Sequence, residues 1–253
     1  MQANYKYILE KCNQLSPNLR ILDYGCGSGD IVQKGLTNRL DIVGVDVFYG
    51  GNSSKKTVLS RDLLNKHVFE LLDNFRIPFP DKSFDFVVSN QVMEHVENLT
   101  LTFREINRIL KPNSLFLVIF PDKRVFREGH CGIPFTHWFK KTSRLRYPYL
   151  RFMRFLGLGY HKNNKSHKQW SLDFINYLDK YTFYRSLNEI KNTFYSSGFS
   201  FKRIEYEYIE YRLRLVGIKI PAIFTKNFIW QNFANYICRM LGTLVILAQK
   251  KDQ

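Results

Sequence analysis

The sequence lacks paired cysteines and long apolar runs. Its cysteines, Cys12, Cys26, Cys131 and Cys238, are too far apart for a zinc knuckle or a CxxC redox pair. Scattered single cysteines are typical of a reducing compartment such as a cytoplasm. No run reaches the roughly 18 to 20 apolar residues that span a bilayer. The first residues have no apolar core either, so we expect neither a spanning helix nor a signal peptide.

Acidic residues are scarce in the second half of the chain. Residues 1–120 hold 14 Lys and Arg against 13 Asp and Glu, whereas residues 121–253 hold 24 against 9. Within residues 123–168 there are 12 basic residues and one acid, Glu128. The first half therefore resembles a nearly neutral globular scaffold. The second half carries a basic, aromatic-rich attachment, which predicts an anionic partner.

Short apolar runs alternate with helical patterns through residues 1–120. This alternation predicts a parallel sheet with helices on both of its faces. Helical spacing is present from Asp30 to Leu36 and again in "NLTLTFREINRIL", which stops at "KPNS". The expected strands are "RILDYG", "DIVGVDV", "HVFEL", "FDFVVSN" and "LFLVIF".

The pattern changes after Pro121. Residues 121–183 are rich in aromatic and basic side chains and have no strong period, so we interpret them as an insertion. Residues 184–253 return to the sheet architecture, with a helical insert at about 211–240. In this last part we expect a helix in "RSLNEIKNTFYSSGF", a strand in "FSFKRIEYEYIEY", a helix in "FIWQNFANYICRML" and a final strand in "GTLVILAQKK".

The stretch "ILDYGCGSGD" predicts a glycine-rich turn between a strand and a helix. Glycines let the backbone approach a ligand, and the start of a helix offers free N–H groups. The spacing is not GxGxxG, and acids stand on both sides, at Asp23 and Asp30. Such a site suits a cationic ligand better than a pyrophosphate. A tight turn that only needs positive φ angles is the alternative.

The spacing D-x-G-x-G-x-G resembles motif I of the class I S-adenosylmethionine-dependent methyltransferases, in the methyltransferase type 11 or UbiE-like group. The likeness continues in "GVDV", "DNFRIPFPDKSFDFVVSNQVMEHV", "ILKPNSLFLVIF" and the final "SSGF" and "GTLVILAQKK". The resemblance implies an α/β fold with a doubly wound, mostly parallel, seven-stranded Rossmann-like sheet and an insertion after the fifth strand. It implies S-adenosyl-L-methionine as the cofactor, and residues 1–120 as the cofactor-binding half of the domain.

The resemblance also implies roles for individual residues. Asp46 would bond both ribose hydroxyls, as a carboxylate can, while Asp73 would accept from the adenine amine. Asp46 could instead be a solvated acid, Asp73 a turn residue and His95 a packing residue. The residues that the resemblance places at the cofactor are Asp23, Gly25, Cys26, Gly27, Gly29, Asp46, Val47, Asp73, Asn74, Asn90, Gln91 and His95.

The start of the insertion is rich in groups that can move a proton. His130 and His137 are candidate general bases, with Glu128 to orient one of them or to act itself. Bracing of the loop is the alternative role. We expect no metal site, because His161 and His167 lie far along the chain. Trp138 could stack on a sugar ring or belong to a small core of the insertion.

The basic stretch from Lys140 to Lys168 has three interpretations. It could follow nucleic acid, rest on an anionic membrane surface, or form a solvated surface. The segment "IKIPAIFTKNFIWQNFANYICRMLG", also aromatic and apolar, favours the membrane or a helix packed on the sheet.

These patterns lead to one main prediction of function. In methyltransferases of this class, segments added after the fifth strand usually build the acceptor pocket. The segment "GHCGIPFTHWF" also resembles bacterial methyltransferases of surface polysaccharide pathways. We therefore predict a cytoplasmic enzyme, peripheral at the inner membrane face, that O-methylates a glycan or lipid-linked glycan. The alternatives are a quinone or sterol precursor, RNA, and a non-catalytic binding protein.

Overall fold

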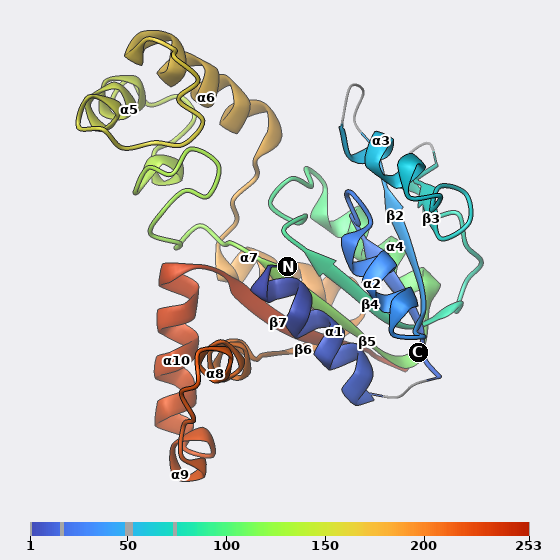
Figure 1. Ribbon diagram of the computed structural model, residues 1–253. Helices are drawn as coiled ribbons and strands as arrows, with labels where there is room; N and C mark the ends of the chain where they lie inside the picture. Colours follow the sequence, from blue (N-terminus) through green and yellow to red (C-terminus); the bar gives the residue numbers. More distant parts are fainter. Residues whose placement is uncertain (1, 16–17, 49–52, 73–74, 253) are drawn as a thin grey trace.

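A seven-stranded mixed sheet forms the centre of the molecule (Figure 1). The computed structural model describes residues 2–15, 18–48, 53–72 and 75–252. The strand order is β3-β2-β1-β4-β5-β7-β6. The first five of these strands are parallel, and β7 runs antiparallel to both β5 and β6. The strands are β1 (Arg20–Tyr24), β2 (Asp41–Asp46), β3 (Val68–Glu70), β4 (Phe84–Asn90), β5 (Leu110–Phe120), β6 (Phe199–Arg203) and β7 (Leu244–Lys250).

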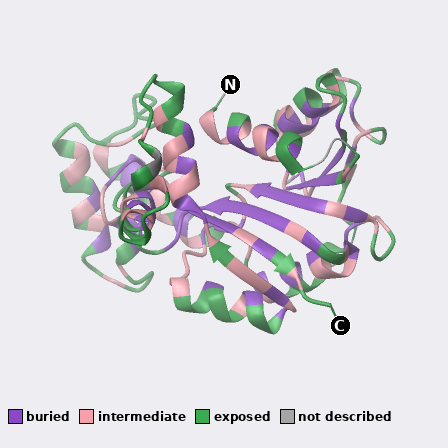
Figure 2. Cartoon of the chain, turned by 90° about the horizontal axis from the view of Figure 1, so that it is seen from below, coloured by how far each residue is buried: buried purple, intermediate pink, exposed green. Residues whose placement is uncertain are grey.

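The predicted fold class is therefore confirmed, including the insertion after the fifth strand. Helices cover both faces of the sheet, and the central strands are buried along most of their length (Figure 2). The helices are α1 (Ala3–Leu15), α2 (Asp30–Thr37), α3 (Ser53–Ser60), α4 (Leu99–Ile109), the 3-10 turn η2 (Thr136–Trp138), α5 (Arg146–Phe155), α6 (His167–Tyr181), α7 (Leu187–Ser196), α8 (Glu205–Leu215), α9 (Ala222–Thr225) and α10 (Phe228–Leu241).

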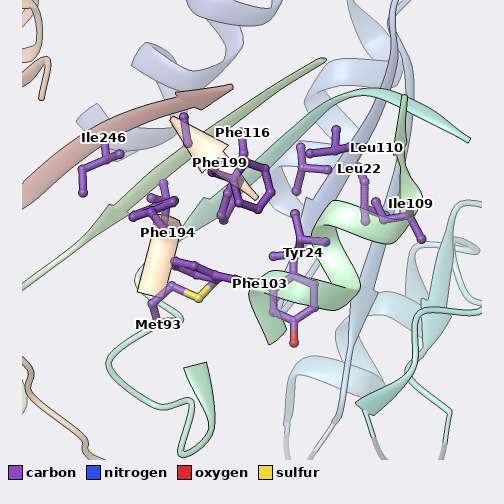
Figure 3. Packing of buried hydrophobic residues seen from close by; sticks show 14 of the residues in the cluster. Leu22, Tyr24, Met93, Phe103, Ile109, Leu110, Phe116, Phe194, Phe199 and Ile246 are labelled. Carbon is purple, nitrogen blue, oxygen red and sulfur yellow. The ribbon is translucent and has the colours of Figure 1, made fainter. Parts of the chain in front are cut away.

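Aromatic side chains form the core between the sheet and helices α4 and α7 (Figure 3). The ring of Phe103 lies 4.4 Å from that of Phe194 and 5.6 Å from that of Phe116, measured between centroids. Met93 belongs to the same cluster and lies near Phe103 in Figure 3. Because Met93 is buried here, the loop that follows β4 is anchored to the core just before Glu94.

The insertion has a core of its own, separate from those that flank the sheet. Trp170 in α6 is fully buried there, and its Nε1–H donates to the Tyr160 carbonyl over 2.8 Å. Arg146 in α5 is paired with Asp179 in α6. In Figure 1, α5 and α6 stand away from the sheet, and two long connections join them to it.

Three details differ from the sequence-based prediction. The predicted strand "FSFKRIEYEYIEY" ends at Arg203, and α8 begins at Glu205. Tyr208 and Tyr211, three residues apart, pack on Tyr7 of α1, which favours a helix over an alternating strand. The predicted turn "KPNS" is part of β5, which starts directly after α4. Helices α5 and α6 were not predicted, because residues 121–183 have no strong period.

Candidate active site

The glycine turn joins β1 to α2 at the carboxyl ends of the parallel strands. Gly25, Gly27 and Gly29 have φ angles of 76°, 53° and 75°, in the left-handed region that glycine adopts without strain. A Cβ on Gly25 would lie 2.3 Å from the Val92 side chain, whereas one on Gly27 would meet nothing within 4 Å. The turn is therefore packed on the Gly25 side, and its backbone is open to a ligand at Gly27.

Asp46 lies beside this open backbone, at the end of β2. Its Oδ2 accepts from the Gly27 N–H over 2.8 Å, and its Oδ1 accepts from the Phe48 N–H over 2.9 Å. Each oxygen keeps a second lone pair, and the residue is only partly buried. Asp46 can therefore accept further hydrogen bonds from a ligand in the turn. Val47, the next residue, is also partly buried.

Asp23, just before the turn, is a buried acid without full pairing. It is 1% exposed, and its Oδ2 has no hydrogen-bond partner among the described residues. Burial raises the pKa of Asp23 to about 8, and the nearby charges of Asp46 and Asp30 add to the effect. A cationic ligand would reverse this shift by stabilising the carboxylate. The acids around the turn therefore fit a positively charged ligand.

The other predicted cofactor residues surround the turn in different ways. The Cys26 thiol points inward, because a Cβ on Gly44 would lie 2.7 Å from its Sγ; Cys26 can therefore offer only its backbone to a ligand. Asn90, at the end of β4, accepts from the Asn4 amide of α1 over 2.8 Å. Gln91 is exposed, with a φ of 57°. Asp73 and Asn74 lie outside the described residues.

The loop after β4 leads from the glycine turn to the insertion. It starts at Val92, which packs against Gly25, and the His95 N–H donates back to the Val92 carbonyl over 2.8 Å. His95 Nε2 then lies 3.2 Å from His130 Nε2. The structure therefore places His95, a predicted cofactor residue, against the predicted catalytic residue His130.

Glu128 is the centre of a hydrogen-bonded network. It is fully buried, and its Oε2 accepts from the backbone N–H groups of His130 and Cys131, over 2.8 and 2.6 Å. Its Oε1 accepts from His130 Nδ1 and from the Tyr184 hydroxyl, each over 2.6 Å. Burial alone would raise the pKa of Glu128, but these donors and the charge of His130 lower it to about 2. Glu128 is therefore an ionised carboxylate that orients His130.

The hydrogen bonds of the two imidazoles determine their protonation. His95 Nδ1 lies 2.6 Å from the Tyr181 carbonyl, which only accepts, so it carries the hydrogen and leaves Nε2 as an acceptor in the neutral ring. His130 Nδ1 donates to the Glu128 carboxylate, so His130 Nε2 must also donate in order to bond His95. When His95 is the neutral ring, this arrangement makes His130 the imidazolium.

The electrostatics of the two histidines agree with this assignment. Burial lowers the pKa of His130, but the hydrogen bond and charge of Glu128 outweigh it, so that the pKa is raised overall. Burial lowers the pKa of His95, and the charge of His130 lowers it further, despite the hydrogen bond to Tyr181. The pair therefore shares one proton, which resides on His130.

Glu94 is a second buried acid beside this network, with the opposite protonation. It is 2% exposed, and its Oε2 has no hydrogen-bond partner within the described ranges. Burial raises the pKa of Glu94 to about 8, although the charge of His130 lowers it. Two carboxyl groups with pKa values pushed apart, one ionised and one protonated, are typical of sites that transfer protons.

The segment that returns from the insertion fixes the His95 loop in place. The Phe183 N–H donates to the Glu94 carbonyl over 2.7 Å. The Arg185 guanidinium donates to the carbonyls of Val96 and Glu97, over 2.7 and 2.6 Å. Sequence reasoning missed Arg185 and Tyr184, because neither belongs to a local motif and both reach the site only through the fold.

His137 lies beside the network and is not part of it. It is buried in η2, and its ring centroid lies 4.5 Å from that of Tyr184. Burial lowers the pKa of His137. Trp138 is 44% exposed; its ring packs on Phe135, and its Nε1–H donates to the Val125 carbonyl. These residues support Tyr184 and the loop around Glu128.

Two further properties bear on possible ligands. Over the described parts of the chain, no three His, Cys, Asp or Glu side chains gather in a way that could hold a metal ion. The helices in those same parts are all too short or too polar to cross a membrane.

Comparison with known proteins identifies what the chain is similar to. Residues 1–201 match a family model described as a methyltransferase domain. A demethylmenaquinone methyltransferase of Symbiobacterium thermophilum is 30% identical over 129 residues, which cover 48% of this chain and 50% of that protein. The chain thus spans about half the length of this relative. A demethylmenaquinone methyltransferase of Staphylococcus saprophyticus is 24% identical over 200 residues, which cover 77% of this chain and 76% of the relative.

The solved structures agree on the fold. An S-adenosylmethionine-dependent methyltransferase from Mesorhizobium loti superposes with a TM-score of 0.57, at 14% sequence identity, and the match covers 98% of each chain. At this identity the similarity concerns the fold alone.

Proposed function

The chain belongs to the methyltransferase domain family, and with it to the class I S-adenosylmethionine-dependent methyltransferases; on that premise we propose that it O-methylates a hydroxyl of a glycan or lipid-linked glycan. The observation that carries the proposal is the Glu128–His130–His95 network, which lies next to the loop that packs on the glycine turn. A hydroxyl acceptor needs a base to take its proton, and this network supplies one.

The residues of the glycine turn would hold the cofactor. S-adenosylmethionine supplies a methyl group on a positively charged sulfur. The open backbone at Gly27 would lie against it, and Asp46 would accept hydrogen bonds from both ribose hydroxyls. Asp23 would ionise in the field of the cation, which accounts for a buried carboxyl with an unpaired oxygen.

His130 would act as the general base. Loss of the shared proton leaves a lone pair on His130 Nε2, while Nδ1–H stays bonded to Glu128. The acceptor hydroxyl would then give its proton to Nε2 as the oxygen–methyl bond forms and the sulfur–methyl bond breaks. Glu128 would stabilise the imidazolium that results, and His95 would position His130. His137 would support the site through Tyr184.

The acidity of the acceptor group bears on the choice between a glycan and a quinone precursor. A sugar hydroxyl is a weak acid, so its methylation benefits from a base held by an ionised carboxylate. An activated phenol or enol carbon needs less help. The network around Glu128 therefore favours an alcohol acceptor over the second candidate, a small lipid-like acceptor such as a quinone precursor. That candidate is supported by the two demethylmenaquinone methyltransferases among the relatives.

The location at the cytoplasmic face of a membrane is also part of the proposal. Four free, buried cysteines support a reducing compartment. A role in polysaccharide biosynthesis would follow from the acceptor and from the basic insertion next to it.

Methyl transfer to two acceptors at saturating cofactor tests the proposal. A lipid-linked oligosaccharide and demethylmenaquinol would be offered separately, with the methyl group of S-adenosylmethionine labelled. We expect label on the glycan, and a loss of about 100-fold or more in kcat in His130→Ala. His137→Ala should retain most of the turnover. Label on the quinol alone, or full turnover by His130→Ala, would refute the assignment.

A further inference from the structure

Large apolar side chains are exposed in two segments that contain no acid. More than half of the strongly exposed large hydrophobic residues among those described lie in residues 145–160 and 215–241. Neither segment contains an Asp or a Glu; residues 145–160 contain three Arg, and residues 215–241 contain two Lys and one Arg. An exposed apolar patch of this kind normally marks a contact surface.

Helix α10 presents the clearer of the two patches. Ala234, Asn235, Cys238 and Arg239 are buried, and the helix packs along α8 on this side. The opposite side carries Ile229, Phe233 and Tyr236, spaced four and three residues apart, which are 78%, 56% and 49% exposed. The one charged residue of α10, Arg239, is turned inward onto Asp122. The outer face of α10 is therefore apolar and uncharged.

Helix α5 presents the second patch, with basic residues around it. Leu150 is buried against the insertion core, whereas Phe152 and Phe155 are 55% and 70% exposed. Arg144, which precedes the helix, and Arg151, which adjoins Phe152 in the sequence, are both exposed. Figure 1 shows α5, α9 and α10 on the same side of the molecule, on the far side of the sheet from α3.

We propose that the exposed faces of α5 and α10 form a docking surface for an anionic lipid bilayer. The aromatic and aliphatic side chains would enter the boundary between headgroups and acyl chains, as those of an interfacial amphipathic helix do. The basic residues would meet the acidic headgroups. This surface is distinct from the Glu128 network, and its test requires no methyl acceptor.

Charge and chemistry favour a bilayer over other partners. A second copy of this chain that covered both patches would bring the exposed arginines around α5 face to face, and their like charges would repel. Nucleic acid would need cations along its path, yet Ile223, Ile229 and Leu241 offer nothing to a phosphate. A bilayer accommodates both the apolar face of α10 and the bases around α5.

Co-sedimentation with vesicles tests this surface. The full chain would be mixed with vesicles of phosphatidylcholine alone, or of phosphatidylcholine with phosphatidylglycerol. We expect binding to the anionic vesicles, weakened by salt. The double variant Ile229→Gln with Phe233→Gln, and likewise Phe152→Gln with Phe155→Gln, should each lower the bound fraction about tenfold.

Matched substitutions on the other side of the molecule provide the control. Leu59→Gln in α3 and Leu101→Gln in α4 replace residues that are 65% and 60% exposed, and they should not change vesicle binding. Arg144→Gln with Arg151→Gln should reduce binding to anionic vesicles, whereas Lys56→Gln with Arg104→Gln should not. The proposal is overturned if the wild type ignores anionic vesicles, or if α10 variants bind them as well as wild type. It is also overturned if those variants lose self-association in analytical ultracentrifugation instead of vesicle binding.

Discussion

At the scale of the residue, the number of protons in a buried network constrains the chemistry. The ring nitrogens of His95 and His130 face the Tyr181 carbonyl, the Glu128 carboxylate and each other. These three hydrogen bonds need three ring hydrogens, which is one more than two neutral imidazoles carry. The same site keeps Glu128 ionised and Glu94 protonated. In the proposed mechanism, the base for a hydroxyl acceptor would form only after the shared proton is lost, so activity would depend on pH.

Removing the charge of Glu128 should move this pH dependence. In wild type, the raised pKa of His130 places the acid limb of the kcat/KM profile above the value for a free imidazole. Glu128→Gln takes away the charge that raises it, so the limb should shift to lower pH, with a maximal kcat about 10 to 100 times lower. Tyr184→Phe, which removes one donor to Glu128 and keeps the ring, is the milder control. An unshifted limb in Glu128→Gln would mean that His130 is not the titrating group.

Loss of the Asp46 carboxylate should weaken cofactor binding. Asp46→Ala deprives the Gly27 and Phe48 N–H groups of their acceptor as well as the ribose hydroxyls. At about 1.5 to 3 kcal/mol for each hydrogen bond to a charged group, the Kd for S-adenosylhomocysteine should rise by about 100-fold or more. Asp41→Ala, at the exposed start of the same strand, should bind like wild type. Equal affinity of Asp46→Ala and wild type would place the ribose elsewhere.

At the scale of the element, apolar runs predicted the sheet well, because buried parallel strands need uninterrupted hydrophobic residues. "FDFVVSN" is β4, and "DIVGVD" is β2. The insertion was harder to predict. Its helices bury one side on a small local core and expose aromatic residues on the other, so that no clear period remains. Glu128 and His130 could be paired from sequence because they are neighbours; Tyr184 and Arg185 could not, because only the folded chain brings them there.

The separate core of the insertion should allow it to lose order by itself. Trp170→Ala removes its largest buried side chain and the bond to the Tyr160 carbonyl. This should cost about 3 to 5 kcal/mol of local stability. Hydrogen exchange should then speed up in α5 and α6 while β1, β4 and β5 stay protected, and cofactor binding should persist. Uniformly faster exchange throughout the sheet would show that the insertion is not an independent unit.

At the scale of the whole molecule, charge is divided between two regions. Acids gather at the glycine turn and in the network around Glu128, whereas bases dominate the second half. Three carboxyl groups are buried and have raised pKa values: about 8 for Asp23 and Glu94, and about 7 for Glu205 in α8. Each of these groups therefore holds its proton in the folded state at a pH where the unfolded chain has lost it.

These raised pKa values predict how the stability of the folded protein depends on pH. Because these folded pKa values are raised, their contribution to stability is complete at low pH and is lost as the pH rises through the folded pKa. The melting temperature of the cofactor-free protein should therefore fall as the pH rises from about 5 to about 8, and it should level off once the folded groups have also lost their protons. Asp23→Asn and Glu94→Gln should each flatten that decline in differential scanning calorimetry. A melting temperature that rises over this window would contradict the assigned protonation states.

The most direct test of the central claim is isothermal titration of the wild-type chain with S-adenosylmethionine and with S-adenosylhomocysteine. The open backbone at Gly27, the carboxylate of Asp46 and the unpaired Asp23 predict binding of both with a Kd in the micromolar range. Because Asp23 loses a proton when the cation binds, the affinity for S-adenosylmethionine should increase between neutral pH and about pH 9. No heat of binding with either compound would show that the glycine turn does not hold this cofactor. That result would also refute the proposed methyl transfer.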